Sequence, residues 1–241
     1  MTGPEAITGP EAEAASTPRS VRARVRAELT AEIVAAAGEE LAEVGPAALS
    51  LRSVARRLGM VPSALYRYFP SRDSLLTALI TEAYEAVGAV AEQAAGSADG
   101  SLDRWLALCR AVRTWGRAHP QQWALIYGSP VPGYAAPQTT VAAALRVTLA
   151  VAGVLRDAPG ARPPQGVAPD EPGLEPVVAP IRDALLPGRD APTVAATVLA
   201  WTSLTGMVSL ELFGHYEGGT TEFEPLFAYC MALSGRAAGL D

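Results

Sequence analysis

Two short segments with helical apolar spacing, separated by one tight turn, constrain this chain more than any other feature. Ser50 precedes the first segment, Leu51–Leu58, as a good helix N-cap, and Gly59 follows it as a C-terminal stop. The second segment runs from Pro62 to Phe69, with proline at an early helical position where its missing N–H costs little. This arrangement predicts a helix-turn-helix.

Helical patterns cover the rest of the chain as well. Alanine, leucine and arginine lead the helix-propensity ranking, and 47 of the 241 residues are alanine, while all 19 basic residues are arginine. Because no apolar–polar alternation persists beyond a few residues, we expect an all-α fold. The first helix carries an apolar stripe from Val25 to Val44 and is expected to end at Gly45-Pro46. Further helices are expected over residues 71–95, 102–118, 120–127, 139–155, 174–186, 190–216 and 223–238.

Composition divides the chain into three parts. Residues 1–18 contain Gly, Pro, Glu and Ala without an apolar core, which predicts a disordered leader and neither a signal nor a transit peptide. Residues 19–70 form the expected three-helix helix-turn-helix domain, and residues 71–241 form a C-terminal helical domain. Within the latter, residues 157–172 are rich in Pro, Gly and Ala and are the clearest flexible loop.

The charge is distributed unevenly. The net charge of −6 seems at first to argue against a nucleic-acid partner, yet residues 18–72 hold nine arginines and only five acids. From Val44 to Arg72 there are five arginines and no acid. Such a patch is the electrostatic footprint of phosphate contact, although a solvated helical surface has the same composition.

The sequence offers little for catalysis. With two cysteines and two histidines, a disulfide scaffold and a zinc site with paired cysteine ligands are excluded. Neither a phosphate-binding glycine loop nor an HExxH or GxSxG motif is present. We therefore expect no catalytic site, no metal and no cofactor; the rival reading, an enzyme with an apolar pocket, lacks a plausible nucleophile–base pair.

One uncharged run of 20 residues, Ala191–Leu210, is long enough to span a bilayer. It contains Pro192, Gly206, four threonines and two serines, and no positive cluster flanks it. These residues favour a helix that is buried on most sides inside a soluble protein, and we expect no membrane partner.

The segment from Ala48 to Leu76 resembles the DNA-binding domain of TetR/AcrR-type transcriptional regulators. The matching features are the cap at Ser50, the Leu58-Gly59 turn, Leu65-Tyr66-Arg67-Tyr68-Phe69 and Arg72. Two positions depart from the family pattern. Tyr68 stands where histidine is frequent, and Val61 stands where Ser or Thr often caps the recognition helix.

The second half resembles TetR-like C-terminal domains that carry a Trp-x-x-x-His-Gly signature. Here the signature begins at Trp201, and Thr205 replaces its histidine before Gly206. The two resemblances together cover most of residues 20–240.

The first resemblance implies which residues contact DNA. Base reading is assigned to the exposed face of the second helix, namely Pro62, Ser63, Ala64, Tyr66 and Arg67, with packing as the alternative for Tyr66. The candidates for phosphate contact are Ser50, Arg52, Tyr68 and Arg72, together with Arg22, Arg24 and Arg26, which form either an arm along the DNA or a solvated tail.

The second resemblance implies a ligand cavity in the C-terminal domain. Its candidate lining is Trp105, Leu108, Cys109, Val112, Trp123 and Tyr127, with core packing as the alternative for each. Cys109 is either a redox sensor or a buried apolar thiol. The two long C-terminal helices of each subunit would form a four-helix dimer interface, for which the candidates are Val198, Trp201, Gly206, Val208, Leu212 and Phe227.

These features predict a ligand-responsive, DNA-binding transcriptional regulator in the cytoplasm. We expect a homodimer that binds a palindromic operator in double-stranded DNA, most simply as a repressor, and that a small apolar or aromatic effector releases. Activation stays open because the difference lies in operator position. The alternative is a helical module that binds a small molecule or a partner without sequence-specific DNA binding.

Overall fold

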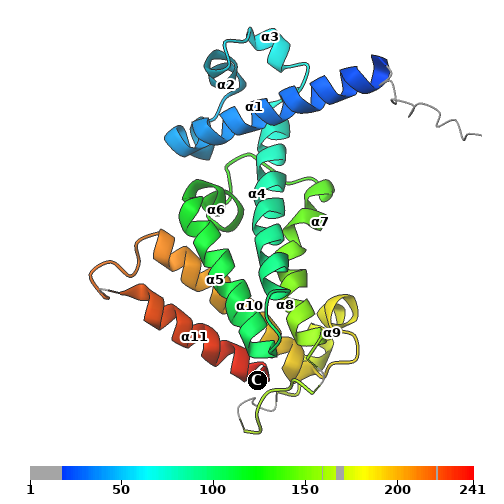
Figure 1. The fold of residues 1–241 in the computed structure, drawn as a ribbon, viewed down its shortest axis with the longest axis vertical. Coiled ribbons are helices and arrows are strands. Elements are labelled where there is room, and N and C mark those ends of the chain that lie inside the picture. Colours follow the sequence, from blue (N-terminus) through cyan, green and yellow to red (C-terminus); the bar gives the residue numbers. More distant parts are fainter. Residues whose placement is uncertain (1–17, 159, 167–170, 221) are drawn as a thin grey trace, which may run out of the picture.

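The computed structural model describes residues 18–158, 160–166, 171–220 and 222–241, and all regular secondary structure within these ranges is helical (Figure 1). The expected leader lies outside the described residues except for Pro18, which begins the first helix. The helices are α1 (Pro18–Ala48), α2 (Leu51–Arg57), α3 (Pro62–Leu65), α4 (Arg72–Ala95), α5 (Ser101–Ala118), α6 (Pro120–Tyr127), α7 (Val141–Ala144), α8 (Arg146–Arg156), α9 (Leu174–Leu185), α10 (Ala191–Leu212) and α11 (Phe223–Ala237), with a 3-10 turn (Gln138–Thr140) before α7.

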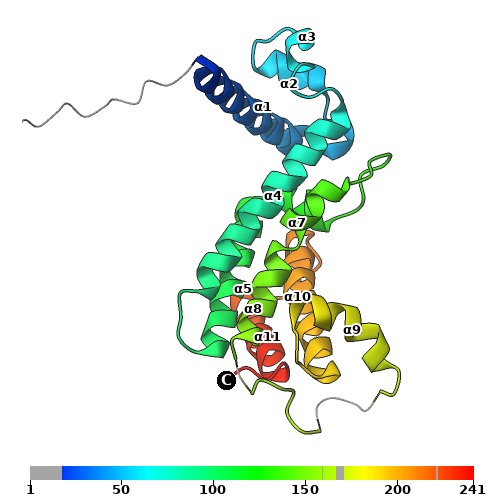
Figure 2. The same cartoon turned by 90° about the vertical axis from the view of Figure 1, so that its right-hand side faces the viewer.

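Helix α4 connects the two halves of the molecule. It runs from the α1–α3 layer into the bundle formed by the later helices (Figures 1 and 2). A capping box fixes its start, because the Ser71 hydroxyl accepts from the Ser74 N–H while the Ser74 hydroxyl accepts from the Ser71 N–H. Leu75 and Leu79 belong to the core of the first layer, whereas Val87 belongs to the core of the bundle. The two cores therefore meet along α4, and the domain boundary at residue 70 stays a prediction.

The smaller core holds the helix-turn-helix on α1 and on the first half of α4. Val54, Ala55 and Leu65 are fully buried in it, as the spacing of the two short segments predicts. Leu125 of α6 and Val131 in the loop after it join the same core from the second half of the chain. The helix-turn-helix is thus attached to the bundle by more than the α4 connection.

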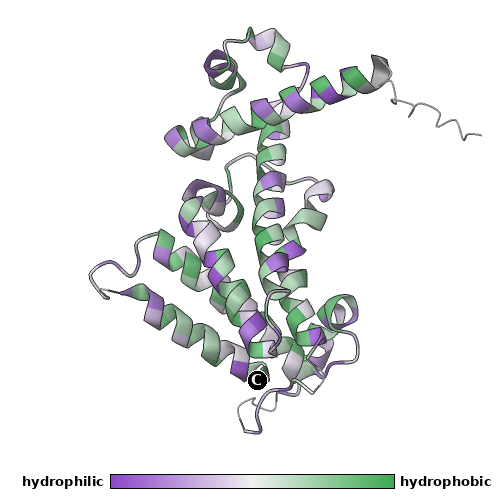
Figure 3. Ribbon diagram, viewed as in Figure 1, coloured by the Kyte–Doolittle hydropathy of each residue, from purple (hydrophilic) through white to green (hydrophobic). Residues whose placement is uncertain are grey.

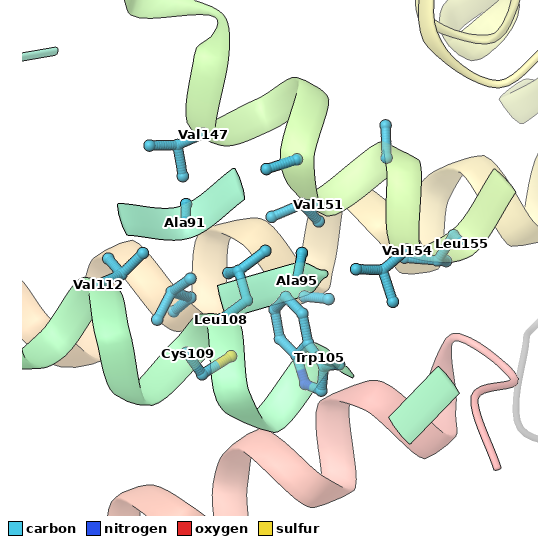
Figure 4. Packing of buried hydrophobic residues seen from close by; sticks show 14 of the residues in the cluster. Ala91, Ala95, Trp105, Leu108, Cys109, Val112, Val147, Val151, Val154 and Leu155 are labelled. Carbon is cyan, nitrogen blue, oxygen red and sulfur yellow. The ribbon is translucent and has the colours of Figure 1, made fainter. Parts of the chain in front are cut away.

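The larger core lies between α4, α5, α8, α10 and α11, and Figure 4 shows the part where α4, α5 and α8 meet. The Trp105 indole donates to the Met231 carbonyl at 2.7 Å, which ties α5 to α11. At Gly235 a Cβ atom would lie 2.5 Å from Trp105 Cδ1, so glycine is required for this close approach.

One expected helix boundary agrees with the structure and two differ from it. Gly45 interrupts α1 where the sequence predicts the helix to end, with φ 74° and ψ 168°, and helical backbone then resumes as far as Ala48. Helix α3 is only one turn long, and hydrogen-bonded turns continue from it to Phe69, whose N–H donates to the Leu65 carbonyl at 3.0 Å. The helix expected over residues 139–155 is bent by 41° between α7 and α8.

Helix α10 is buried on one side only, which corrects the expectation of burial on most sides. Its buried residues include Val194, Leu204 and Val208, while Leu199 and Leu210 are exposed on the opposite face. By length and composition alone, α4 and α10 suffice to cross a membrane, as does the bent run from Gln138 to Arg156 if counted as one span. In the fold, α10 packs on α11, α9 and α5.

Candidate nucleic-acid interface

The two short helices are fixed by local hydrogen bonds that the sequence predicts. The Ser50 hydroxyl accepts from the Ser53 N–H at 3.1 Å and so caps α2. After α2, Gly59 adopts a left-handed conformation with φ 65°, and the Met60 N–H donates to the Ala55 carbonyl at 2.8 Å. A residue with a side chain is strained in this conformation, so glycine sets the angle of the turn.

An ion-pair cluster holds α2 against α1. Arg57 reaches Glu39 at 3.5 Å and Glu40 at 3.1 Å, and it also pairs with Glu43. A hydrogen bond from Ser53 and then the Arg57 guanidinium lower the pKa of the Glu40 carboxyl below its usual value. One of the five arginines in the acid-free window is therefore engaged with acids from α1 and is not free for a phosphate.

The expected base-reading residues form an outward-facing segment. Pro62, Ser63 and Arg67 are exposed, and Ala64 is half-buried. Tyr66 has an exposed fraction of 45%, which favours a contact with a partner over the packing alternative. As its departure from the family pattern implies, Val61 makes no side-chain hydrogen bond at the start of α3. The individual base contacts stay predictions.

Next to this segment lies an open depression of about 410 Å³ between the first residues of α2 and α4. Its lining includes Ser50, Arg52, Tyr66 and Arg72, which brings three of the expected phosphate contacts together with one base-reading residue. The N-terminus of the 24-residue helix α4 opens at the same place, and helix N-termini attract anions. The depression has the chemistry of a phosphate cradle.

Arg72, which lines this depression, forms hydrogen bonds with backbone carbonyl groups. Its Nε donates to the Leu49 carbonyl at 3.1 Å, and its Nη2 donates to the Pro46 carbonyl. These bonds tie the start of α4 to the segment before α2. Arg52 is exposed, so it is the better candidate for a direct phosphate contact.

The arginines near the N-terminus lie on the first turns of α1, and their contact with DNA stays a prediction. Arg22, Arg24 and Arg26 all fall within α1 and are exposed. The Arg26 guanidinium donates to the Arg67 carbonyl at 3.2 Å and lies 4.9 Å from the ring centroid of Tyr68. Arg26 therefore links α1 to the recognition segment, and Tyr68 is half-buried beneath it.

The residues expected to line an effector pocket pack as core. Five of these side chains are fully buried and Tyr127 is partly buried, and all six belong to or pack against the larger core: Trp105, Leu108, Cys109, Val112, Trp123 and Tyr127. Figure 4 shows the first four beside residues of α4 and α8. Burial raises the pKa of the Cys109 thiol well above its usual value, which disfavours the reactive thiolate of a redox sensor. Core packing, the alternative reading, describes these positions better.

Two of the expected dimer residues are also core. Val208 and Phe227 are fully buried within one chain, so they cannot contact a second one, which corrects their assignment. Val198 is exposed, whereas Trp201, Gly206 and Leu212 are only partly buried.

Large apolar residues are exposed along α10, at its C-terminal end and along α11, whose ribbons have mostly hydrophobic or neutral colours in Figure 3. We call them the outer stripe: Leu199, Leu210, Phe213, Leu226, Tyr229 and Leu233. Their helical spacing was available in the sequence. The sequence does not show which of the two apolar sides of α10 faces solvent.

Within the described residues, no group of three or more His, Cys, Asp or Glu side chains is placed to hold a metal ion.

Family models match both halves of the chain. Residues 33–79 match the family described as bacterial regulatory proteins, tetR family, and residues 105–233 match a Tetracyclin repressor-like C-terminal domain.

Curated relatives and solved structures extend the match to most of the chain. The HTH-type transcriptional regulator Rv1816 of Mycobacterium tuberculosis is 41% identical over 207 residues, which are 81% of this chain and 85% of the relative. The crystal structure of SCO4313 has a TM-score of 0.75 at 32% identity and covers 91% of this chain and 98% of its own. A TetR family transcriptional regulator from Thermus thermophilus, PfmR, shares the fold with a TM-score of 0.53 at 18% identity, covering 85% of this chain and 97% of its own.

Proposed function

The chain belongs to the TetR family and is a DNA-binding transcriptional regulator, and we propose that it acts as a homodimeric repressor in the cytoplasm. Repression and ligand response are typical of the family. In the proposal the dimer covers a palindromic operator in double-stranded DNA, a small effector releases it, and the chain catalyses no reaction. The observation that carries the proposal is the exposed recognition segment next to the depression at the start of α2 and α4.

The recognition segment and the depression have different roles in this proposal. Tyr66 and Arg67 read base edges, since both are exposed and arginine pairs with guanine through two hydrogen bonds. Ser50 and Arg52 contact the phosphate backbone beside them, which sets the register of the protein without reading sequence. Arg26 holds the recognition segment by bonding to the Arg67 carbonyl, and Arg72 holds the start of α4 against the residues before α2 by bonding to the Leu49 and Pro46 carbonyls.

A dimer follows from the size of the recognition segment and from the outer stripe. One such segment reads too few base pairs for useful specificity, and paired segments bind half-sites about 34–36 Å apart or a multiple of that. The outer stripe offers an apolar surface along α10 and α11, which lie in the half of the molecule away from α2 and α3 (Figure 1). Two copies joined there form a four-helix interface of α10 and α11 and leave both recognition segments free.

Release by an effector requires that the bundle and the helix-turn-helix move together. Helix α4 has one half in each core, and Leu125 and Val131 add a second connection. A ligand that shifts α4 within the bundle therefore changes the separation of the two recognition segments. It does so only if it binds the released state more tightly than the DNA-bound state.

We expect Arg67→Ala and Arg52→Ala to weaken DNA binding in different ways. The test first selects an operator from a randomised duplex library with the full-length protein. Arg67→Ala should lose about 5- to 150-fold in discrimination at one position of each half-site, because a two-hydrogen-bond base contact is lost. Arg52→Ala should weaken binding to all sequences alike and lower the salt slope by about one.

Arg110 is an exposed arginine on α5 far from the interface, and Arg110→Ala serves as the matched control that should bind as the wild type does. A wild-type protein that enriches no palindrome from the library, while folded and dimeric, would refute sequence-specific binding and support the ligand-binding module instead.

A further inference from the structure

A small apolar cavity of about 40 Å³ lies between α8, α9 and α10, away from the residues that the sequence assigned to a pocket. Its lining includes Val151 and Ala152 of α8, Ile181 and Leu185 of α9, and Val194 and Trp201 of α10. No charged side chain is among the residues that line it.

Trp201 carries a buried polar atom without a partner. Its indole Nε1 has no hydrogen-bond acceptor among the described residues. Two other tryptophans are satisfied, since Trp105 donates to a carbonyl and Trp123 donates to the Ser209 hydroxyl at 3.0 Å. An unpaired buried N–H costs free energy, so such a group in a folded protein requires an explanation.

Two threonines also line the cavity, Thr148 of α8 and Thr197 of α10. The Thr197 hydroxyl donates to the Thr193 carbonyl within α10 at 2.8 Å. The lining is thus apolar apart from these hydroxyls, and the Trp201 indole N–H is a buried donor without a partner among the described residues. That combination suits an uncharged molecule that is apolar apart from a single hydrogen-bond acceptor, because an ionised ligand would be buried there without a counter-charge.

We propose that this cavity is the effector site and that the Trp201 Nε1–H is its hydrogen-bond donor. The ligand class is a small uncharged molecule with one acceptor oxygen, such as a cyclic ketone. The effector role rests on the proposed function, whereas the binding site itself does not.

Of the three helices that line the cavity, α9 is the one that moves when a ligand binds. The present cavity has room for little more than water, so a ligand with a ring must displace one of its walls. Helix α9 packs mainly on α10, contains Pro180, and buries only Val178 fully. The opposite walls, α8 and α10, are each packed on several other helices.

The position of the cavity explains how occupancy reaches the DNA-binding end. Helix α8 packs along α4, which carries the helix-turn-helix, and α10 carries part of the outer stripe. A ligand bound between α8 and α10 therefore acts on α4 through α8 and on the proposed dimer interface through α10.

Nuclear magnetic resonance of the four tryptophan indole N–H groups in the full-length protein tests the site. The probes are cyclohexanone and methylenecyclohexane, which have nearly the same shape but differ in the acceptor oxygen. We expect cyclohexanone to move the Trp201 indole proton signal downfield in a saturable manner, because a hydrogen bond forms, and methylenecyclohexane to leave the signal less shifted. No saturable shift with either probe, or equal shifts with both, would overturn the site.

Two variants complete the test. Trp201→Phe assigns the signal and should weaken cyclohexanone binding about fivefold, the worth of one neutral hydrogen bond, with little effect on methylenecyclohexane. Trp115→Phe, a buried tryptophan outside the cavity lining, is the matched control and should bind both probes as the wild type does. A loss of cyclohexanone binding in Trp115→Phe equal to that in Trp201→Phe would also overturn the assignment.

Operator affinity, measured on the library-selected operator with and without saturating cyclohexanone, tests the effector role separately. A weaker complex in its presence supports that role, and binding that leaves operator affinity unchanged overturns it. If the protein binds no operator but still shows the Trp201 shift, the proposed function is contradicted and the binding site is supported.

Discussion

Replacing Leu233 with arginine is expected to turn the dimer into a monomer and to weaken operator binding about a thousandfold. Leu233 lies on the outer stripe with an exposed fraction of 57% in the single chain. In a two-fold dimer each substitution appears twice in one interface, so two cations are buried against apolar surface. The loss in affinity follows because a monomer binds one half-site without the gain from a linked second contact.

Light scattering gives the mass in solution, and titration against the selected operator gives the affinity. Val177→Arg is the matched control. Val177 has a larger exposed fraction, 71%, but lies on α9 and outside the outer stripe, so this variant should remain dimeric and bind the operator. A Leu233→Arg protein that stays dimeric and binds with wild-type affinity would show that the interface is elsewhere.

Arg113→Met should lower the stability of the C-terminal bundle by about 3 kcal/mol. Arg113 is buried, with hydrogen bonds of 2.6 and 2.7 Å from its guanidinium to the two Glu211 oxygens and a further bond to Glu224. It also lies 5.0 Å from the ring centroid of Phe227. Its loss leaves the carboxylate of Glu211, only 17% exposed, without its main partner, and breaking a buried pair costs about 3–5 kcal/mol.

We take the lower end of that range because Arg117 stays 3.7 Å from Glu211. Thermal unfolding should show a melting temperature lower by about 6–12 °C for a chain of this size. Arg117→Ala, in which the side chain is 61% exposed, should cost little. The double variant Arg113→Met with Glu211→Leu should recover part of the lost stability, since the carboxylate that lost its partner is then also removed. Equal melting temperatures for Arg113→Met and Arg117→Ala would disprove the role of the buried pair.

The helix-turn-helix and its exposed face could be predicted because their signals are local. The Ser50 cap and the Gly59 turn act within a few residues, and both are present in the structure. The same local reading overestimated the positive charge available to DNA. Arg57 is paired with acids of α1, and Arg72 bonds to carbonyls 23 and 26 residues away. Because these partners lie so far from the arginines in the sequence, local patterns do not reveal them.

In the bundle as well, sequence patterns do not reveal which residues pack together. Trp105 and Trp201 are both tryptophans on helices, but the first has an acceptor on α11 and the second has none among the described residues. The family resemblance implied a pocket along the stripe around Trp105, whereas the cavity of about 40 Å³ lies beside Trp201. Whether an apolar face encloses space or fills it depends on the packing of helices far apart in the chain.

By itself the sequence determined the all-α class, the helix-turn-helix and the separation of charge between the two halves, because propensities, caps and charges are properties of neighbouring residues. Only the tertiary structure decided which arginines remain exposed, which side of α10 is left uncovered, and where a cavity remains. Those outcomes depend on which helices meet, and a nearly uncharged helix such as α10 has apolar residues on every side, so its sequence does not say which side packs.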